Sequence, residues 1–248
     1  MEKEMRNFMK KTVLITGASS GIGSSSAKIF ASNNYNIIVN YKSNDLKANN
    51  LKKELENKYN IEVLLCKADI SKEEDVIAMF DTIKEKFKTL DVIINNAGIS
   101  IDQTLNDKTS KEFNKVINTN LIGTFLVIKY GSKLMEKGSI INVASTNGID
   151  TEYIESIDYD ASKAGVISLT RNFANVLAPN IRVNAVASGW VNTEMTKDLF
   201  DEFKKEEEKK ILLGRFAEAE EIAKVIYFLS SEDASYINKT VIRVDGGF

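Results

Sequence analysis

Short apolar runs alternate with longer amphipathic stretches along the whole of this 248-residue chain. Several of the short runs are rich in Val and Ile and almost uninterrupted by polar residues, as expected for strands that are buried on both faces. Runs of this kind, separated by helical stretches, are typical of a parallel sheet covered by crossover helices. The pattern therefore predicts an α/β fold with a doubly wound parallel sheet of seven strands.

The expected elements fill the chain from residue 12 onward. Strands are predicted at residues 12–16, 36–41, 62–67, 91–95, 139–144, 181–187 and 240–244. Helices are predicted near residues 22–33, 45–59, 72–88, 110–136, 158–178 and 219–230, with a further amphipathic stretch at about 195–210. Ser71 and Glu74 have the spacing of a capping box for the third helix, and Pro179 stands where a long helix must end. No Pro-, Gly- or Ser-rich linker interrupts the series, so we expect one Rossmann-like domain over residues 11–248 after an N-terminal extension over residues 1–10.

The chain contains no histidine and a single cysteine, Cys66. Without histidine it cannot build a Ser-His-Asp or Cys-His nucleophile, or a zinc site that needs an imidazole. Proton transfer must therefore use Tyr, Lys, Asp or Glu. A lone cysteine cannot form an intrachain disulfide or a cysteine cluster, so we expect a reduced environment and no metal site.

The 33 basic and 35 acidic side chains are interspersed and give a net charge of −2. Scattered lysines of this kind do not form a surface that tracks nucleic-acid phosphates. The N-terminal residues lack the apolar segment of a signal peptide, and no apolar run approaches the roughly 18 residues of a membrane span. We therefore expect a cytoplasmic protein without a nucleic-acid or membrane partner. The charged run over residues 202–210 is interpreted as a solvated helical face without a chemical role.

A glycine-rich turn follows the first predicted strand and leads directly into the first predicted helix. Its glycines have the spacing Gly-x-x-x-Gly-x-Gly, and the residues expected to contact a cofactor are Gly17, Ser19, Ser20, Gly21, Ile22 and Gly23. A dinucleotide pyrophosphate needs bare backbone here, because N–H groups at a helix N-terminus must approach the phosphate oxygens closely. The turn therefore predicts a dinucleotide-binding site.

The end of the second predicted strand distinguishes NAD from NADP. A carboxylate there would bond the ribose 2′-hydroxyl and repel a 2′-phosphate. Asn40 occupies that position, followed by Tyr41 and by Lys42, which can pair with a phosphate. Asp45 lies close by in sequence and argues in the opposite direction. We predict NADP(H) as the cofactor in preference to NAD(H).

Tyr159 and Lys163 are four residues apart at the start of a predicted helix, so their side chains are neighbours on one helical face. Tyrosine and lysine occur at this spacing by chance in a lysine-rich chain, so the surroundings decide the interpretation. Ser145 follows the strand over 139–144, at the sheet edge where α/β folds bind ligands. Asn120 lies in the long helix predicted before that strand.

With these motifs the chain resembles the short-chain dehydrogenase/reductase family from about residue 11 to residue 248. The residues that carry the resemblance are the turn over 16–23, the Asn-Asn-Ala-Gly turn with Asn95, Ala97 and Gly98, the adenine-contacting pair Asp69 and Ile70, the catalytic tetrad Asn120, Ser145, Tyr159 and Lys163, and the signature over 245–247. The resemblance implies that Lys163 also holds the nicotinamide ribose, that Ser145 bonds the substrate carbonyl, and that Asn120 helps to hold a water in a proton relay.

The expected chemistry follows from the residue types. A ketone that accepts a hydride develops negative charge on oxygen and needs a proton from a positioned donor. Tyr159 is the predicted donor, although a phenol has a reference pKa of about 10 and is a poor acid near neutral pH. The Lys163 ammonium, together with the positive nicotinamide ring of the oxidised cofactor, is expected to lower the pKa of Tyr159.

The segment after the sixth predicted strand departs from the family pattern. Ser188 stands where relatives commonly have proline, so we expect a more mobile loop there. Gly189, Val191 and Thr193 match the family's cofactor contacts. The stretch over about 190–214 is expected to form a substrate flap. The apolar residues that either line its pocket or pack on the body of the domain are Trp190, Met195, Leu199, Phe200 and Phe203.

Overall pattern and length resemble most the 3-oxoacyl-[acyl-carrier-protein] reductases of fatty-acid synthesis within this family. An acidic carrier protein needs basic residues beside the cleft, and the available ones are Lys129, Lys133, Lys137 and Arg171. The loop before Tyr159 carries Asp150, Glu152, Glu155 and Asp158, which should disfavour such a partner. Alternatives are an NADP-dependent reductase of a sugar, polyol or other small neutral carbonyl compound, and a non-catalytic NADP-binding regulator. The resemblance also implies a homotetramer.

Overall fold

The computed structural model describes residues 10–248, so residues 1–9 of the predicted N-terminal extension lie outside the described residues. Seven strands form one sheet in the order β3-β2-β1-β4-β5-β6-β9, and every neighbouring pair is parallel. Their bounds are β1 Thr12–Ile15, β2 Asn36–Tyr41, β3 Val63–Lys67, β4 Val92–Asn95, β5 Gly138–Ser145, β6 Ile181–Ser188 and β9 Val241–Val244. The predicted seven-stranded, doubly wound parallel sheet is confirmed.

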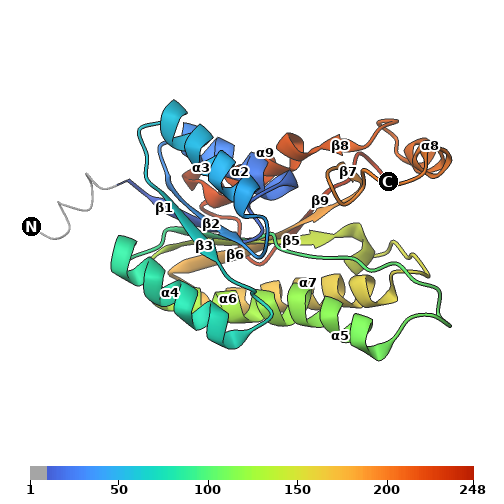
Figure 1. Cartoon of the computed structure of the whole chain (residues 1–248), viewed down its shortest axis with the longest axis horizontal. Coiled ribbons are helices and arrows are strands. Elements are labelled where there is room, and N and C mark those ends of the chain that lie inside the picture. The colour runs from blue at the N-terminus through green and yellow to red at the C-terminus, as the bar shows by residue number, and fades with distance from the viewer. Residues whose placement is uncertain (1–9) are drawn as a thin grey trace, which may run out of the picture.

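Helices cover both faces of this sheet (Figure 1). One layer contains α2 Gly21–Ser32, α3 Asp45–Lys58 and α9 Ala219–Ser230, and the other contains α4 Glu73–Phe87, α5 Ser110–Ile117, α6 Gly123–Gly131 and α7 Ile157–Leu177. Short 3-10 turns lie at Ser132–Leu134, Thr146–Gly148 and Glu232–Ala234. The flap residues form a separate lobe, with helix α8 Asp201–Lys210 and a two-stranded parallel ribbon of β7 Val191–Asn192 and β8 Ala217–Glu218.

The predicted helix over 110–136 is interrupted. α5 ends at Ile117, a π-helical turn occupies Asn118–Ile122, and α6 begins at Gly123. Asn120 sits in this turn, and its side chain bonds both the N–H and the carbonyl oxygen of Ile99 in another loop. Single π-helical turns inside α-helices are frequent at functional sites.

The predicted capping box of the third helix is wrong. α4 begins after Lys72, which makes no side-chain capping bond. The Ser71 hydroxyl instead donates to the Asp69 carboxylate at 2.7 Å, and the Ser71 N–H donates to the same oxygen. The serine therefore orders the turn after β3 instead of closing the helix end. α7 ends at Leu177, two residues before Pro179, as the sequence predicts.

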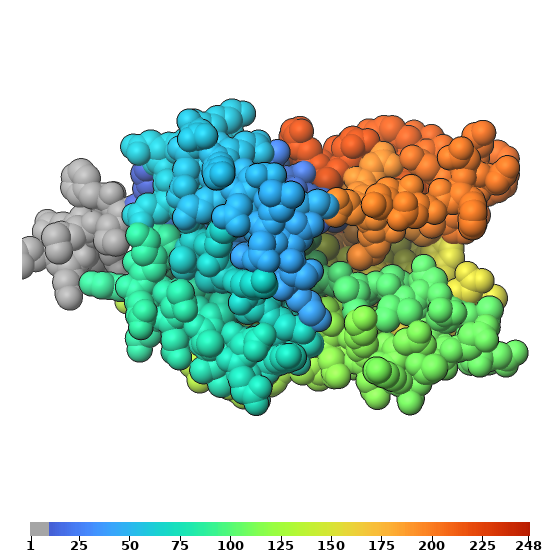
Figure 2. All heavy atoms as spheres, viewed as in Figure 1, coloured from blue at the N-terminus to red at the C-terminus, as the bar shows by residue number. Residues whose placement is uncertain are grey.

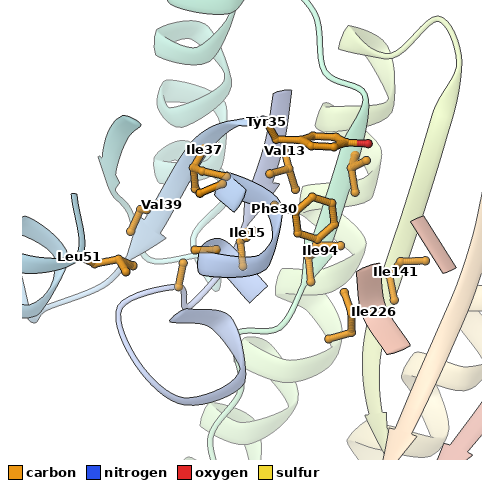
Figure 3. Close-up of a cluster of buried hydrophobic side chains, with 14 of the residues drawn as sticks. Val13, Ile15, Phe30, Tyr35, Ile37, Val39, Leu51, Ile94, Ile141 and Ile226 are labelled. Atoms are coloured by element: carbon orange, nitrogen blue, oxygen red, sulfur yellow. The ribbon is translucent and has the colours of Figure 1, made fainter. Parts of the chain in front are cut away.

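The hydrophobic core lies on both sides of the central strands, with one cluster under each helical layer. Figure 3 shows part of the cluster beneath α2, α3 and α9, with Phe30 among side chains of β1 and β4. Phe30 is completely buried, and its ring makes edge-to-face contacts with Tyr35 at 5.1 Å and Tyr227 at 5.2 Å between centroids. This packing fixes α2 against the sheet and so fixes the turn that precedes it.

Replacing Phe30 by alanine should lower the free energy of unfolding by about 3–5 kcal/mol, because it leaves a cavity where three aromatic rings meet. The measurement is urea unfolding followed by circular dichroism. Leu46→Ala on α3 is the matched control, since Leu46 is 72% exposed, and it should change stability little. Equal effects of the two substitutions would contradict this account of the core.

Candidate active site

A cleft of about 750 Å³ opens at the carboxyl ends of the parallel strands. Its lining comes from the segments that follow β1, β2, β3, β4, β5 and β6, together with the flap. In the space-filling view the flap, in orange, stands over the green segment near residue 100 (Figure 2). This is the edge at which open α/β sheets bind ligands, because adjacent connections leave the sheet in opposite directions there.

The glycine-rich turn has the bare backbone that the sequence predicts. Gly17 and Gly21 have φ angles of +61° and +53°, which disfavour any residue with a Cβ. A Cβ on Gly23 would lie 2.5 Å from the carbonyl oxygen of Gly17. Ser20 precedes α2 without a side-chain capping bond, so the first N–H groups of that helix are left for another acceptor.

A second turn holds the glycine turn in place. The Asn96 side-chain amide donates to the carbonyl oxygens of Thr16 at 2.9 Å and Gly17 at 3.2 Å. The Thr16 hydroxyl oxygen accepts the N–H groups of Asn96 and Ala97, each at 3.0 Å. The Asn-Asn-Ala-Gly turn after β4 therefore fixes the position of the turn after β1.

The polar residues at and after the end of β2 differ in what their side chains contact. Asn40 is buried, and its amide donates to the carbonyl oxygens of Cys66 and Ala68, so it mainly joins β2 to β3. Lys42 is half exposed and pairs with Asp69 at 2.7 Å. Asp45 does not line the cleft, because its carboxylate accepts from Lys67 at 2.7 Å and from the Tyr41 hydroxyl at 3.0 Å.

Ser145, Tyr159 and Lys163 lie together at one end of the cleft. Ser145 is the last residue of β5, and its hydroxyl bonds Tyr159 and Asn147. Lys163 lies one turn beyond Tyr159 on α7, with its Nζ 5.4 Å from the centre of the tyrosine ring. The Lys163 ammonium donates to the carbonyl oxygen of Val143 at 2.8 Å.

Burial controls the titration of both groups in the protein itself. It raises the pKa of Tyr159 to about 12, against a lowering contribution from the Ser145 hydroxyl and further raising by Asp160 and Asp102. It also lowers the pKa of Lys163 to about 8. In the protein alone Lys163 does not contribute to the pKa of Tyr159, and its ammonium donates to Val143 and lies over the ring face. The predicted lowering also involves the positive nicotinamide ring of the oxidised cofactor, and it stays a prediction.

Three predicted site residues lie behind the lining of the cleft. These are Gly23, Asn95 and Asn120. The Asn95 amide donates to Asn142 at 2.8 Å within the sheet, and the Asn142 amide donates to Thr170 at 2.9 Å. The Asn120 amide donates to Ser162 at 3.0 Å. The Asn120 Oδ1 and the Lys163 Nζ both lie close to Gly98, which lines the cleft.

The other predicted cofactor-contacting residues line the cleft. They are Gly17, Ser19, Ser20, Gly21, Ile22, Asn40, Tyr41, Lys42, Asp69, Ile70, Ala97, Gly98, Gly189, Val191 and Thr193. Ser188 is the last residue of β6 and pairs in register with Ser145 on one side and Val244 on the other. The sheet therefore holds Ser188 itself, and greater mobility of the loop that follows it stays a prediction.

The flap residues Trp190, Met195, Leu199, Phe200 and Phe203 all line the cleft. Sequence reasoning missed the residue that hydrogen-bonds Trp190 and holds it in place, which is Glu207. Glu207 belongs to the charged run interpreted as a solvated face, yet it is only 2% exposed. Its carboxylate accepts the Trp190 indole N–H at 3.0 Å and the Tyr153 hydroxyl at 2.5 Å. The repetitive charges of this run carry no signal that marks one glutamate as buried.

Two of the four carboxylates predicted at the lip of the cleft form ion pairs. Asp158 is fully buried and pairs with Lys108 at 3.0 Å, and Asp150 pairs with Arg243 at 2.7 Å. The predicted repulsion of an acidic partner is therefore weaker than the sequence indicates. The Asp158 carboxylate also accepts the N–H of Tyr159, so this buried ion pair fixes the start of α7.

Within residues 10–248 there is no group of three or more His, Cys, Asp or Glu side chains that could hold a metal ion. Over the same residues, no helix is both long and apolar enough to cross a membrane.

Comparisons with known proteins agree with this geometry. A family model described as enoyl-(acyl carrier protein) reductase matches residues 17–248. The 3-oxoacyl-[acyl-carrier-protein] reductase FabG of Aquifex aeolicus is 37% identical, with 96% of each chain covered. The enzyme of that name from Staphylococcus aureus is 39% identical, with 96% of this chain and 98% of the relative covered.

Two solved structures are similar to this chain in fold over almost its whole length. A short-chain dehydrogenase from Burkholderia cenocepacia in complex with NADP has a TM-score of 0.91 at 25% identity, covering 96% of this chain and 97% of that one. A blue fluorescent protein from a metagenomic library in complex with NADPH has a TM-score of 0.91 at 28% identity with the same coverage.

Removing one partner of the buried Lys108–Asp158 pair should be far more damaging than removing both. Lys108→Met leaves an unpaired buried carboxylate and should cost about 3–5 kcal/mol of unfolding free energy. The double variant with Asp158→Asn should recover most of that loss. Urea unfolding measures both, and Lys209→Met, in an exposed pair with Glu206, is the control. A double variant as unstable as Lys108→Met would show that the pair is not what holds this end of α7.

Proposed function

Because the chain belongs to the short-chain dehydrogenase/reductase family, we propose that it is an NADPH-dependent oxidoreductase that reduces the ketone of a 3-oxoacyl thioester. The observation that supports this most directly is that the glycine turn and the flap line one and the same cleft. Ser145, Tyr159 and Lys163 stand at the point where a bare glycine turn meets an apolar flap. Such a site can hold a dinucleotide on one side and an acyl chain on the other.

The residues around the glycine turn fit the dinucleotide. A Cβ on Gly17 would lie 2.9 Å from the Cα of Ala97, so only glycine lets the two turns approach this closely. The free N–H groups at the start of α2 suit a pyrophosphate. Lys42 and Lys47 line the cleft near the end of β2 and would hold a 2′-phosphate, while Asp45 is directed to Lys67. Two structural neighbours, named above, contain NADP or NADPH.

Bound NADPH supplies the hydride in this chemistry. The protein's own contribution is to orient the ketone and to provide a proton. The Ser145 hydroxyl would donate to the substrate oxygen, and the Tyr159 hydroxyl, already bonded to Ser145, would transfer its proton to that oxygen. Lys163 would bind the ribose hydroxyls and keep the Tyr159 ring in place. Asn120, through its bonds to Ile99, would hold a water that connects Lys163 to solvent.

The flap favours an acyl thioester over a sugar or polyol. Of the polar flap residues that line the cleft, Thr193 lies beside Gly21 and Glu194 pairs with Lys47. Most of the other flap residues along the cleft are apolar, and Phe200 is 80% exposed and Met195 55% exposed. An acyl chain would cover these side chains, whereas a polyhydroxylated substrate would leave its hydroxyl groups unpaired against them. The curated relatives are named as 3-oxoacyl-[acyl-carrier-protein] reductases.

An acyl-carrier protein is the partner we propose for delivery of the substrate. The ion pairs of Asp150 with Arg243 and of Asp158 with Lys108 weaken the repulsion predicted at the lip of the cleft, and the curated relatives are named for substrates carried by this protein. We also propose a homotetramer in the cytoplasm. Exposed apolar side chains on α6, on α7, on α9 and just after α9 support an assembly, and they are Phe125, Val176, Phe228 and Tyr236 respectively.

NADPH oxidation with three substrate classes tests this proposal. We expect turnover with an acetoacetyl thioester, and little with a small sugar or with a crotonyl thioester, which represents the enoyl reduction in the family model's description. Tyr159→Phe should reduce kcat by at least about 100-fold, since it removes the proton donor, and should leave NADPH binding intact. Reduction of crotonyl thioester alone, or unchanged turnover by Tyr159→Phe, would refute the proposal.

The pKa of Lys163, lowered by burial to about 8, predicts that NADPH binds more weakly as the pH rises above that value. Below it the side chain is an ammonium that donates to the ribose, and above it the charge is lost. Titration of the NADPH dissociation constant by fluorescence from about pH 7 to about pH 9.5 checks this. Lys163→Arg stays charged throughout, so its affinity, although lower, should not vary with pH. A wild-type affinity that stays constant over this range would contradict the assignment.

A further inference from the structure

The buried carboxylate of Glu207 has no place in the chemistry described above. α8 is otherwise an exposed helix, and Glu207 is its one buried residue. Taking a carboxylate out of water is costly unless several donors satisfy it. Here Oε2 accepts from both Trp190 and Tyr153, and Oε1 pairs with Lys210 at 2.6 Å. A carboxylate so fully satisfied is unsuited to bind substrate itself and suited to hold its partners.

The two partners that Glu207 joins belong to different walls of the cleft. Trp190 follows β6 at the base of the flap, and Tyr153 lies in the loop between β5 and α7. Both side chains line the cleft. Their rings meet edge to face at 5.5 Å between centroids, and the Trp190 Nε1 is also 3.1 Å from the Tyr153 hydroxyl oxygen. The carboxylate therefore ties the flap to the loop that precedes the catalytic tyrosine.

Packing leaves Trp190 few alternatives to this position. Its ring stacks on Phe216 at 5.3 Å with an interplanar angle of 10°, and Phe203 of α8 meets it edge to face at 5.7 Å. Phe216 is only 1% exposed, so this stack is buried within the flap lobe. The bond to Glu207 then selects the orientation of the indole within this stack.

Tyr153 is connected in turn to the catalytic serine. Its backbone N–H donates to Asp160 at 3.2 Å, and the other Asp160 oxygen accepts the Asn147 amide at 2.7 Å. The Ser145 hydroxyl donates to the Oδ1 of Asn147 at 3.1 Å. These bonds hold the Tyr153 backbone without Glu207, so loss of the carboxylate would release the Tyr153 side chain and leave Ser145 in place.

We propose that Glu207 is a positioning residue for the substrate pocket, because its carboxylate fixes Tyr153 and Trp190 as two adjoining aromatic walls. The pocket then has its shape before the substrate enters, and selects an acyl group by fit. The inference rests on the proposed reductase function only for its kinetic test, since the clamp of Glu207, Tyr153 and Trp190 is a property of the free protein.

Trp190 is the only tryptophan in the chain, so its fluorescence reports this clamp directly. Glu207→Leu removes the acceptor and should shift the emission to longer wavelength and increase quenching by acrylamide. Glu207→Gln keeps an acceptor oxygen for both donors and should resemble the wild type. Glu206→Leu, on the same helix but paired only with exposed Lys209, is the matched control and should not change the emission. An unchanged spectrum for Glu207→Leu would overturn the proposal.

Kinetics with the N-acetylcysteamine thioester of acetoacetate provide the second measurement. Glu207→Leu should raise KM by about 10-fold to 100-fold, because two buried donors lose their acceptor and the pocket walls separate. Its kcat and its NADPH dissociation constant should change by less than about threefold. Glu207→Gln should restore KM. A loss of kcat and NADPH binding together, without recovery in Glu207→Gln, would show a merely structural role and overturn the proposal.

If Glu207→Leu fails to fold, Tyr153→Phe decides the question, because it keeps the ring and removes only the donor hydroxyl. It should raise KM while leaving kcat within about threefold, and an unchanged KM would overturn the proposal.

The fluorescence and kinetic measurements also separate the proposed function from the clamp of Glu207, Tyr153 and Trp190. A wild-type protein that reduces no thioester refutes the proposed function, while the fluorescence of the Glu207 variants still tests the clamp.

Discussion

The site depends on the contact between two turns at the carboxyl ends of neighbouring strands. The turn after β1 and the turn after β4 approach so closely that a Cβ on Gly17 would lie 2.9 Å from the backbone of Ala97. Thr16 and Asn96 join the two turns by hydrogen bonds in both directions. Parallel pairing of β1 with β4 sets this separation, and the packing of Phe30 beneath α2 maintains it. The glycine turn therefore keeps a fixed position along the cleft, which it lines with Gly17 and Gly21.

The second constraint is the burial of two ionisable side chains beside that space. With no histidine in the chain, the proton donor we propose is a phenol whose pKa burial raises to about 12, next to a lysine whose pKa burial lowers to about 8. At neutral pH Lys163 is therefore an ammonium and Tyr159 a neutral phenol in the protein alone. A cationic ligand ring beside Tyr159 would favour the phenolate and so narrow the gap between the two pKa values.

The sequence predicts the sheet and most of the cleft because both depend on local patterns. The seven strands lie within one residue of their predicted bounds at either end, and glycine spacing identifies the turn after β1. What the sequence does not predict depends on partners distant in the chain. The π-helical turn at Asn120 accompanies its bonds to Ile99, and the burial of Glu207 depends on Tyr153 and Trp190. Charge pairing is equally non-local, as Asp158 with Lys108 demonstrates.

The central claim is that Tyr159 is the proton donor and that its surroundings set its pKa. The most direct test is a titration of the Tyr159 Cζ chemical shift by ¹³C NMR, assigned by comparison with Tyr159→Phe, in the free protein and with NADP⁺ bound. The account predicts a pKa of about 12 in the free protein and a pKa lower by at least about one unit with NADP⁺, because a positive ring then faces the phenol. A Tyr159 pKa that stays the same in both states would contradict it.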